Sequence, residues 1–155
     1  MLHDYKSLNV WQKNNGLGLE NHILVVEDDP CLVKFWKRIL EDMPEYSSTI
    51  FNNPFAALHW LKTNSPDLLV TDLSMPGMDG TSLIRCVLQK NPDTKVILTT
   101  GFVPEQNDFD QLGARIHLVP KPYTNMTHVP SLIKLLFSED ADLEETTEKI
   151  SVWNI

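Results

Sequence analysis

The sequence predicts an α/β fold in which five strands and five helices alternate, (βα)5, around a doubly wound five-stranded parallel sheet. Short apolar runs that end abruptly in polar residues recur along the chain, which is typical of strands buried on both faces. Segments with apolar residues at helical spacing separate these runs. The connections are only a few residues long. Because a helix lies between successive strands, the strands are expected to run parallel, with helices covering both faces of the sheet.

The five predicted strands share aliphatic and β-branched residues bounded by polar or turn residues. In chain order they are residues 22–26 (HILVV), 47–51 (SSTIF), 67–71 (DLLVT), 95–100 (KVILTT) and 114–119 (ARIHLV). The first is a continuous apolar run that stops at EDDP, whereas the second begins with two serines and carries the weakest signal.

The five predicted helices share helical spacing of their apolar residues, and most begin with a recognisable signal. In chain order they are residues 31–43, 53–63, 80–90, 104–113 and 129–137. Pro30 suits a first helical turn, and either acid before it can cap that helix. Asn53 and Pro54 open the second helix, and Pro130 is tolerated only in the first turn of the last. The fourth helix, PEQNDFDQLG, is short and polar.

Composition and charge predict one domain with two tails. Residues 1–20 are polar and are interpreted as an N-terminal extension, residues 21–138 as the domain, and residues 139–155 as an acidic C-terminal tail. The segment SEDADLEETTEK has six acids and one lysine, and so carries −5 of the net charge of −8. Without clustered Lys and Arg, the chain is not expected to bind nucleic acid.

The chain is expected to be soluble, cytoplasmic and without membrane contact. It has no apolar run long enough to span a bilayer, and its first residues lack the apolar core of a signal peptide. Cys31 and Cys86 fall in predicted helices without a C-x-x-C motif, so they are expected to be reduced and to lie in or near the core.

The candidate reactive residues lie at the carboxyl ends of four predicted strands. They are Glu27, Asp28 and Asp29 after the first strand, Asp72 after the third, Thr99 and Thr100 at the end of the fourth, and Lys121 after the fifth. In a parallel sheet these ends meet at one edge. Close carboxylates repel and require a proton or a cation, and Mg²⁺ is a natural partner. A lysine can pair with a phosphoryl oxygen, and a hydroxyl can donate to one. These groups suit the phosphorylation of an aspartate.

Each of these residues also has an ordinary structural explanation. An acid after a strand is often a helix N-cap, and an aspartate before Met-Pro-Gly is often a turn residue. The coincidence of complementary groups at four ends of one sheet favours a reactive site over four unrelated turns.

Four motifs, in this order, resemble the receiver domain of response regulators, the phosphoacceptor half of two-component signalling. They are ILVVEDD, VTDLSMPGMDG, ILTTG and VPKPY, and the resemblance extends from His22 to about Phe137. It implies membership of the CheY-like superfamily and a flavodoxin-like strand order of 2-1-3-4-5.

The resemblance implies a role for each strand end. Asp72 matches the phosphoacceptor and Lys121 the lysine that pairs with phosphate. Thr100 matches the switch hydroxyl, because a small residue follows it, and Thr99 is the alternative if the register slips by one residue. The Lys121–Pro122 bond is expected to be cis, as in the family.

The resemblance also implies a Mg²⁺ cofactor. Its expected ligands are Asp28 directly, Glu27 through water, Asp72, and the backbone carbonyl of Ser74. Asp29 falls outside this set and is interpreted as a helix cap.

Two further positions refine this interpretation. Asp79 is interpreted as the cap of helix 80–90 rather than as a catalytic acid. Receivers usually carry Tyr or Phe three residues before the lysine, and here that position is Leu118. Any switching that follows phosphorylation is therefore expected to proceed without that aromatic ring.

The predicted function is that of a phosphorelay response regulator that accepts a phosphoryl group from a histidine kinase or a histidine phosphotransfer protein onto Asp72. It would signal by protein–protein contact and catalyse only its own phosphorylation and dephosphorylation. The partner is expected to dock near the first helix, where Leu32 or Val33 contributes. A receiver-like binding module without phosphoryl turnover, or the excised receiver of a hybrid histidine kinase, remain alternatives. The tail is either solvated or a docking segment.

Overall fold

The computed structural model describes residues 21–102, 112, 116–123 and 127–138. The predicted N-terminal extension (1–20) and acidic tail (139–155) lie outside the described residues, and so does the predicted fourth helix apart from Leu112. The chain divides into two units, Met1–Tyr123 and Thr124–Ile155, which are described separately. In the described residues, the first unit contains the sheet and three helices, and the second contains one helix.

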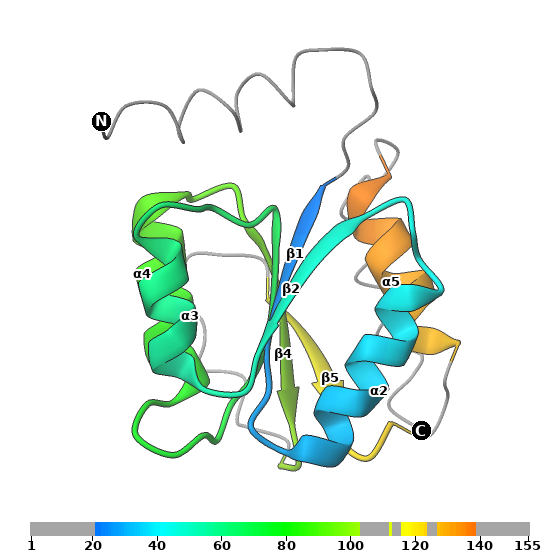
Figure 1. Ribbon diagram of the computed structural model, residues 1–155, viewed down its shortest axis with the longest axis horizontal. Coiled ribbons are helices and arrows are strands. Elements are labelled where there is room, and N and C mark those ends of the chain that lie inside the picture. The colour runs from blue at the N-terminus through cyan, green and yellow to red at the C-terminus, as the bar shows by residue number, and fades with distance from the viewer. Residues whose placement is uncertain (1–20, 103–111, 113–115, 124–126, 139–155) are drawn as a thin grey trace. The chain divides into compact units, whose positions relative to one another are not determined.

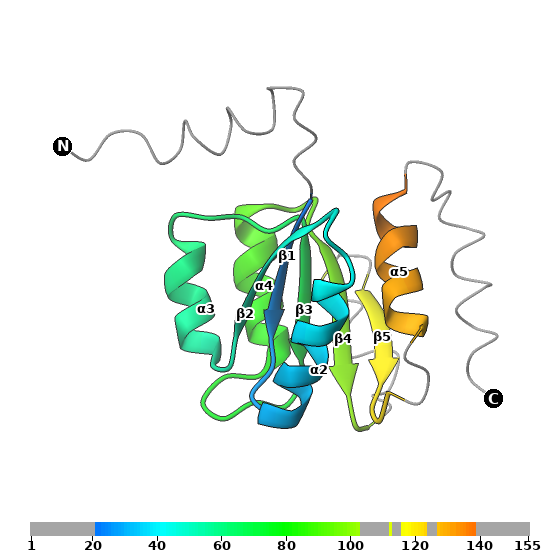
Figure 2. The same cartoon turned by 45° about the vertical axis from the view of Figure 1, so that its right-hand side comes forward.

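Five strands form one sheet. They are β1 (His22–Val26), β2 (Ser47–Phe51), β3 (Leu68–Asp72), β4 (Lys95–Thr100) and β5 (Ile116–Pro120). Their order is β2-β1-β3-β4-β5, and every neighbouring pair is parallel. The strand arrows accordingly point the same way in Figure 2. This confirms the predicted strand order and places all the carboxyl ends at one edge of the sheet.

The described helices follow the predicted alternation. They are α2 (Pro30–Glu41), α3 (Pro54–Leu61) and α4 (Gly80–Lys90) in the first unit, and α5 (His128–Phe137) in the second. Figure 1 shows α3 and α4 on one face of the sheet and α2 on the other. Among the described residues, no helix is long and apolar enough to cross a membrane.

Aspartate caps begin two of these helices. The Asp29 carboxylate accepts a hydrogen bond from the Cys31 amide at 2.7 Å at the start of α2. At the start of α4, Asp79 accepts from the Thr81 hydroxyl at 2.6 Å and from the Ser82 amide at 2.7 Å, and these bonds lower the pKa of Asp79. Both capping predictions are therefore confirmed.

Alternate residues of the central strands pack on opposite faces of the sheet. The cluster on the face of α3 and α4 contains Leu24, Val26, Ala57, Leu61, Leu69, Met75, Leu83, Ile84, Val87, Val96 and Leu98. Because side chains alternate along a strand, Val70 of β3 and Ile97 of β4 point to the opposite face, which α2 covers.

Cys31 and Cys86 are free, as expected for reduced thiols, but the prediction that they lie in or near the core was wrong. Cys31 and Cys86 are both exposed, because they lie outside the buried stripes of α2 and α4. A position within a helix does not by itself show whether a side chain is buried. The apolar character of cysteine did not predict burial at these two positions.

Candidate functional site

Three carboxylates converge at the carboxyl edge of the sheet. Glu27 and Asp28 follow β1, Asp72 ends β3, and one oxygen of each lies within 4.8 Å of the others. Glu27 is only 1% exposed and Asp72 only 8%. The two strands are neighbours in the sheet, so the backbone itself holds these acids together. Such a set of hard oxygen donors fits a divalent cation of the Mg²⁺ type.

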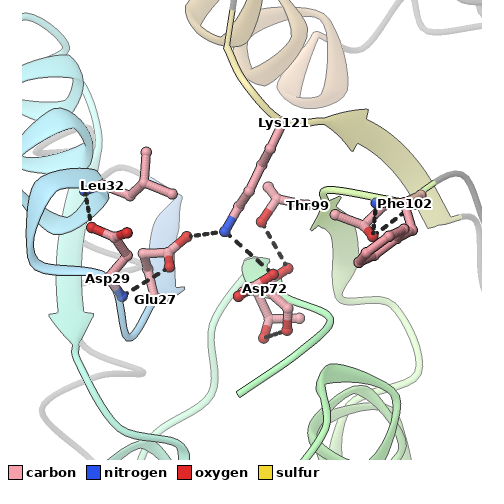
Figure 3. A network of polar contacts seen from close by, with 9 residues as sticks. Glu27, Asp29, Leu32, Asp72, Thr99, Phe102 and Lys121 are labelled. Carbon is pink, nitrogen blue, oxygen red and sulfur yellow. Dashed lines mark hydrogen bonds and ion pairs between the residues drawn. The ribbon is translucent and has the colours of Figure 1, made fainter. Parts of the chain in front are cut away.

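Lys121 reaches between two of these carboxylates (Figure 3). Its Nζ lies 2.9 Å from Glu27 Oε2 and 3.3 Å from Asp72 Oδ1. Burial alone would lower the pKa of Lys121, but the hydrogen bond and charge of Glu27 and the charge of Asp72 raise it above its ordinary value. The ammonium therefore stays charged, and one cation faces three acids within this cluster.

Glu27 is held on both of its oxygens. Oε1 accepts from the Asp29 amide at 3.1 Å, and Oε2 accepts from Lys121. Burial raises the pKa of Glu27, and the bonds from Lys121 and the Asp29 amide oppose that rise. Its charged form thus depends on these two donors.

The two threonines of β4 differ in their orientation. Asp72 lies opposite Thr99 in register, so these side chains share a face of the sheet. The Thr99 hydroxyl donates to the Thr71 carbonyl at 3.4 Å. The Thr100 hydroxyl donates to the Phe102 carbonyl at 2.7 Å and accepts from the Phe102 amide at 3.1 Å. Each hydroxyl therefore donates its single proton to backbone rather than to Asp72.

The loop between β3 and α4 closes tightly over the end of β3. Ser74 is exposed in this loop, and Gly77 has a φ of 83°, which favours glycine. The Gly80 amide donates to the Leu73 carbonyl at 2.8 Å. A Cβ at Gly80 would collide with the Asp72 carbonyl, so this position requires glycine. Gly80 was not predicted from the sequence as a site residue, although a glycine directly after the Asp79 cap was visible there.

The end of β5 is also fixed by its backbone. The Lys121–Pro122 bond is cis, as expected, and the Lys121 amide donates to the Thr100 carbonyl at 2.8 Å. Leu118 lies opposite Leu98 in register and packs, half-buried, against the apolar cluster of α3 and α4. Tyr123, two residues after Lys121, is an aromatic residue near the site that was not predicted from the sequence.

Comparison with known proteins identifies the family. The family model of the response regulator receiver domain matches residues 23–128, which is more than half of the chain. The chain belongs to this family. The receiver domain thus covers β1 to the beginning of α5 and includes every strand end described above.

Relatives of this receiver domain differ in length. The response regulator receiver protein CpdR of Brucella abortus is 32% identical over 117 residues, which is 75% of this chain and 97% of CpdR. A protein-glutamate methylesterase/protein-glutamine glutaminase of Rhodopseudomonas palustris is 31% identical over 104 residues, 64% of this chain, and the match spans only 28% of that relative's length.

Solved structures show the same fold. The response regulator TrrA of Thermotoga maritima, in complex with Mg²⁺-BeF, aligns with a TM-score of 0.64 and 28% identity over 75% of this chain and 98% of TrrA. The family and the fold class predicted from the sequence are therefore both confirmed.

Proposed function

We propose that this receiver domain is a phosphorelay response regulator in which Asp72 accepts a phosphoryl group from a phosphohistidine on a histidine kinase or a histidine phosphotransfer protein. The observation that carries the proposal is the Lys121 ammonium held between two buried carboxylates, 3.3 Å from Asp72 and 2.9 Å from Glu27. A purely structural ion pair does not need a third acid within 4.8 Å, as Asp28 is.

The transfer is a displacement at phosphorus. An Asp72 oxygen forms the new P–O bond while the P–N bond to the partner's histidine breaks. The imidazole keeps the electrons of that bond and leaves as a neutral ring, because its other nitrogen already carries a proton. Lys121 pairs with an equatorial phosphoryl oxygen, which needs little reorganisation because its ammonium already lies beside Asp72.

Glu27, Asp28, Asp72 and the Ser74 carbonyl would hold Mg²⁺, which supplies charge neutralisation on the transferred group. Glu27 is already held on both oxygens, which favours contact with the ion through water, whereas Asp28 is the candidate for a direct ligand. The role of Glu27 in this chain is then chiefly to position Lys121.

The Thr100 hydroxyl is the candidate group that forms a hydrogen bond with the phosphoryl group once it is on Asp72. We expect it to exchange its bond with the Phe102 carbonyl for a bond to a phosphoryl oxygen, which moves the Phe102 loop. Thr99 remains the alternative, because it shares the face of Asp72. The signal would then pass by protein contact, and the half-buried Leu32 and Val33 of α2 are candidates for contact with the phosphodonor.

A small-molecule phosphodonor with Mg²⁺ tests this function. The intact mass should rise by one phosphoryl group in the wild type, and should not rise in Asp72→Asn or after chelation of the metal. Asp79→Asn is the matched control, because Asp79 follows in the same loop but caps α4, and asparagine also caps helices. It should be phosphorylated like the wild type.

Absence of any mass gain in the wild type would favour a receiver-like binding module that does not turn over phosphate. An equal gain in Asp72→Asn would place the phosphoacceptor elsewhere in the chain.

A further inference from the structure

Tyr123 lies two residues after Lys121 and joins this end of the sheet to helix α2. Its ring stacks on Phe35 with centroids 4.6 Å apart and an interplanar angle of 20°. The same ring meets Trp36 edge-on at 5.8 Å and 77°. Trp36 is fully buried in α2. These contacts account for an aromatic ring at this position, and they serve phenylalanine as well as tyrosine.

The hydroxyl of Tyr123 is not accounted for by packing. The oxygen is buried, and among the described residues it has no hydrogen-bond partner. Burial raises the pKa of Tyr123. The nearby Thr99 and Trp36 side chains and the Lys121 ammonium oppose the rise, and the Glu27 carboxylate adds to it. The approaches of Thr99 and Trp36 do not meet the geometry of a hydrogen bond. The group is therefore a protonated donor next to the phosphorylation site.

A buried hydroxyl without an acceptor destabilises a protein, because it has lost its hydrogen bonds to water and gained none in return. Phenylalanine would preserve both ring contacts without this cost. Buried polar groups are nearly always satisfied, so an exception beside a reactive site calls for a partner that arrives during function.

The Lys121–Glu27 pair indicates which acceptor becomes available. Lys121 Nζ is shared between Glu27 at 2.9 Å and Asp72 at 3.3 Å. A phosphoryl group on Asp72 adds negative charge beside this ammonium and draws it away from Glu27. Glu27 is 1% exposed, so the oxygen that Lys121 leaves cannot be satisfied by bulk water.

We propose that Tyr123 is a positioning residue whose hydroxyl donates to the Glu27 carboxylate when the phosphoryl group on Asp72 engages Lys121. The inference rests on the proposed function. In the empty site Lys121 satisfies Glu27, and in the loaded site Tyr123 replaces it. Because the Tyr123 ring packs on Phe35 and Trp36, this exchange reaches α2. This route passes through α2, whereas Leu118, at the position of the ring usual in the family, packs against the cluster of α3 and α4.

The test uses Tyr123→Phe, which removes only the hydroxyl, and beryllofluoride with Mg²⁺ as the phosphoryl analogue. Without these ligands, Tyr123→Phe should be at least as stable as the wild type in urea. With them, the beryllofluoride concentration for half-saturation at fixed Mg²⁺ should rise about fivefold, the factor expected for one net hydrogen bond. Tyr46→Phe, which removes a hydroxyl just before β2 at the other end of the sheet, should leave the half-saturating beryllofluoride concentration unchanged.

A spectroscopic measurement distinguishes a positioning role of the Tyr123 hydroxyl from mere packing of its ring against α2. The Trp36 indole N–H resonance, assigned with Trp36→Phe, should shift in the wild type when Mg²⁺ and beryllofluoride bind. In saturated Tyr123→Phe most of that shift should be lost.

Half-saturation within twofold of the wild type, or an unchanged Trp36 shift, would overturn the inference. A loss of stability in ligand-free Tyr123→Phe with unchanged affinity would also overturn it, because the hydroxyl would then hold a constant structural partner such as water. A wild type that neither binds the analogue nor accepts phosphoryl groups would contradict the proposed function, and with it this inference. That failure is distinguishable because it appears before any variant is compared.

Discussion

The two ends of the sheet handle polar side chains in opposite ways. At the amino end, His22 of β1 lies between two hydroxyls, with Nδ1 2.7 Å from Ser47 Oγ and Nε2 3.0 Å from Thr49 Oγ1. Its backbone amide donates to Asp67 at 2.7 Å, and its ring stacks on Trp60 at 5.2 Å. A neutral imidazole with partners on both nitrogens suits this half-buried position.

At the carboxyl end, the same strands carry like charges. Glu27 and Asp72 are buried with Asp28 beside them, and within this cluster Lys121 is the cation that they share. The paired hydrogen bonds at the amino end stabilise the fold, whereas the acids at the carboxyl end repel one another until a proton, a metal ion or a reaction partner relieves them. The difference indicates that the carboxyl end of the sheet is less stable than it could be because its residues are arranged for reactivity.

The largest test of this comparison removes the shared cation. Lys121→Met should lower the free energy of unfolding in metal-free buffer by roughly 3–5 kcal/mol, because it leaves the Glu27 carboxylate buried without its cation. Urea titration measures the loss. Addition of Glu27→Gln should restore much of it, and Lys62→Met, at the exposed end of α3, should have little effect. Equal stability of Lys121→Met and Lys62→Met would contradict the conclusion that Lys121 stabilises the buried Glu27 carboxylate.

A second test compares one carboxylate from each end. Asp28→Asn should raise the Mg²⁺ concentration for half-maximal thermal stabilisation at least about tenfold, because it removes a proposed direct ligand. Its metal-free stability should not fall, since one like charge is gone. Asp67→Asn, at the amino end, should bind Mg²⁺ like the wild type. If both variants lowered the affinity for Mg²⁺ equally, the effect would come from the overall charge of the protein rather than from a specific metal site.

The smallest expected effect is the loss of stability at low pH that comes from His22, at the amino end of the sheet. Burial lowers the pKa of His22 below its ordinary 6.5, and the charge of Asp67 opposes this only in part. Between the folded value and 6.5 the unfolded chain therefore binds more protons, so the contribution of His22 is complete above pH 6.5 and is lost as the pH falls below it.

His22→Gln should accordingly show a smaller loss of unfolding free energy between about pH 7.5 and 5.5 than the wild type. His59→Gln, at an exposed position of α3, should retain the wild-type dependence. A wild-type slope in His22→Gln would show that other groups dominate the acid response.

Local patterns in the chain were sufficient for the fold and for much of the site. The apolar runs that stop at Glu27 and at Asp72 identified the strands and their carboxyl ends, and the alternation with helices identified a parallel sheet. A parallel sheet brings its carboxyl ends to one edge, so the meeting of Glu27, Asp28, Asp72 and Lys121 followed from the order of elements. The caps at Asp29 and Asp79 were also local, because a cap contacts amides two or three residues away.

Tertiary structure decided the properties that depend on distant neighbours. Only the register of β3 against β4 shows that Thr99, and not Thr100, lies opposite Asp72. Only the packing of Tyr123 on α2 shows a buried hydroxyl that has no partner within the described part of the chain, and only the faces of the helices show that Cys31 and Cys86 are exposed. The physical reason is that residue type and spacing determine local conformation and periodicity. Register, burial and hydrogen-bond satisfaction are set by residues far away in the chain.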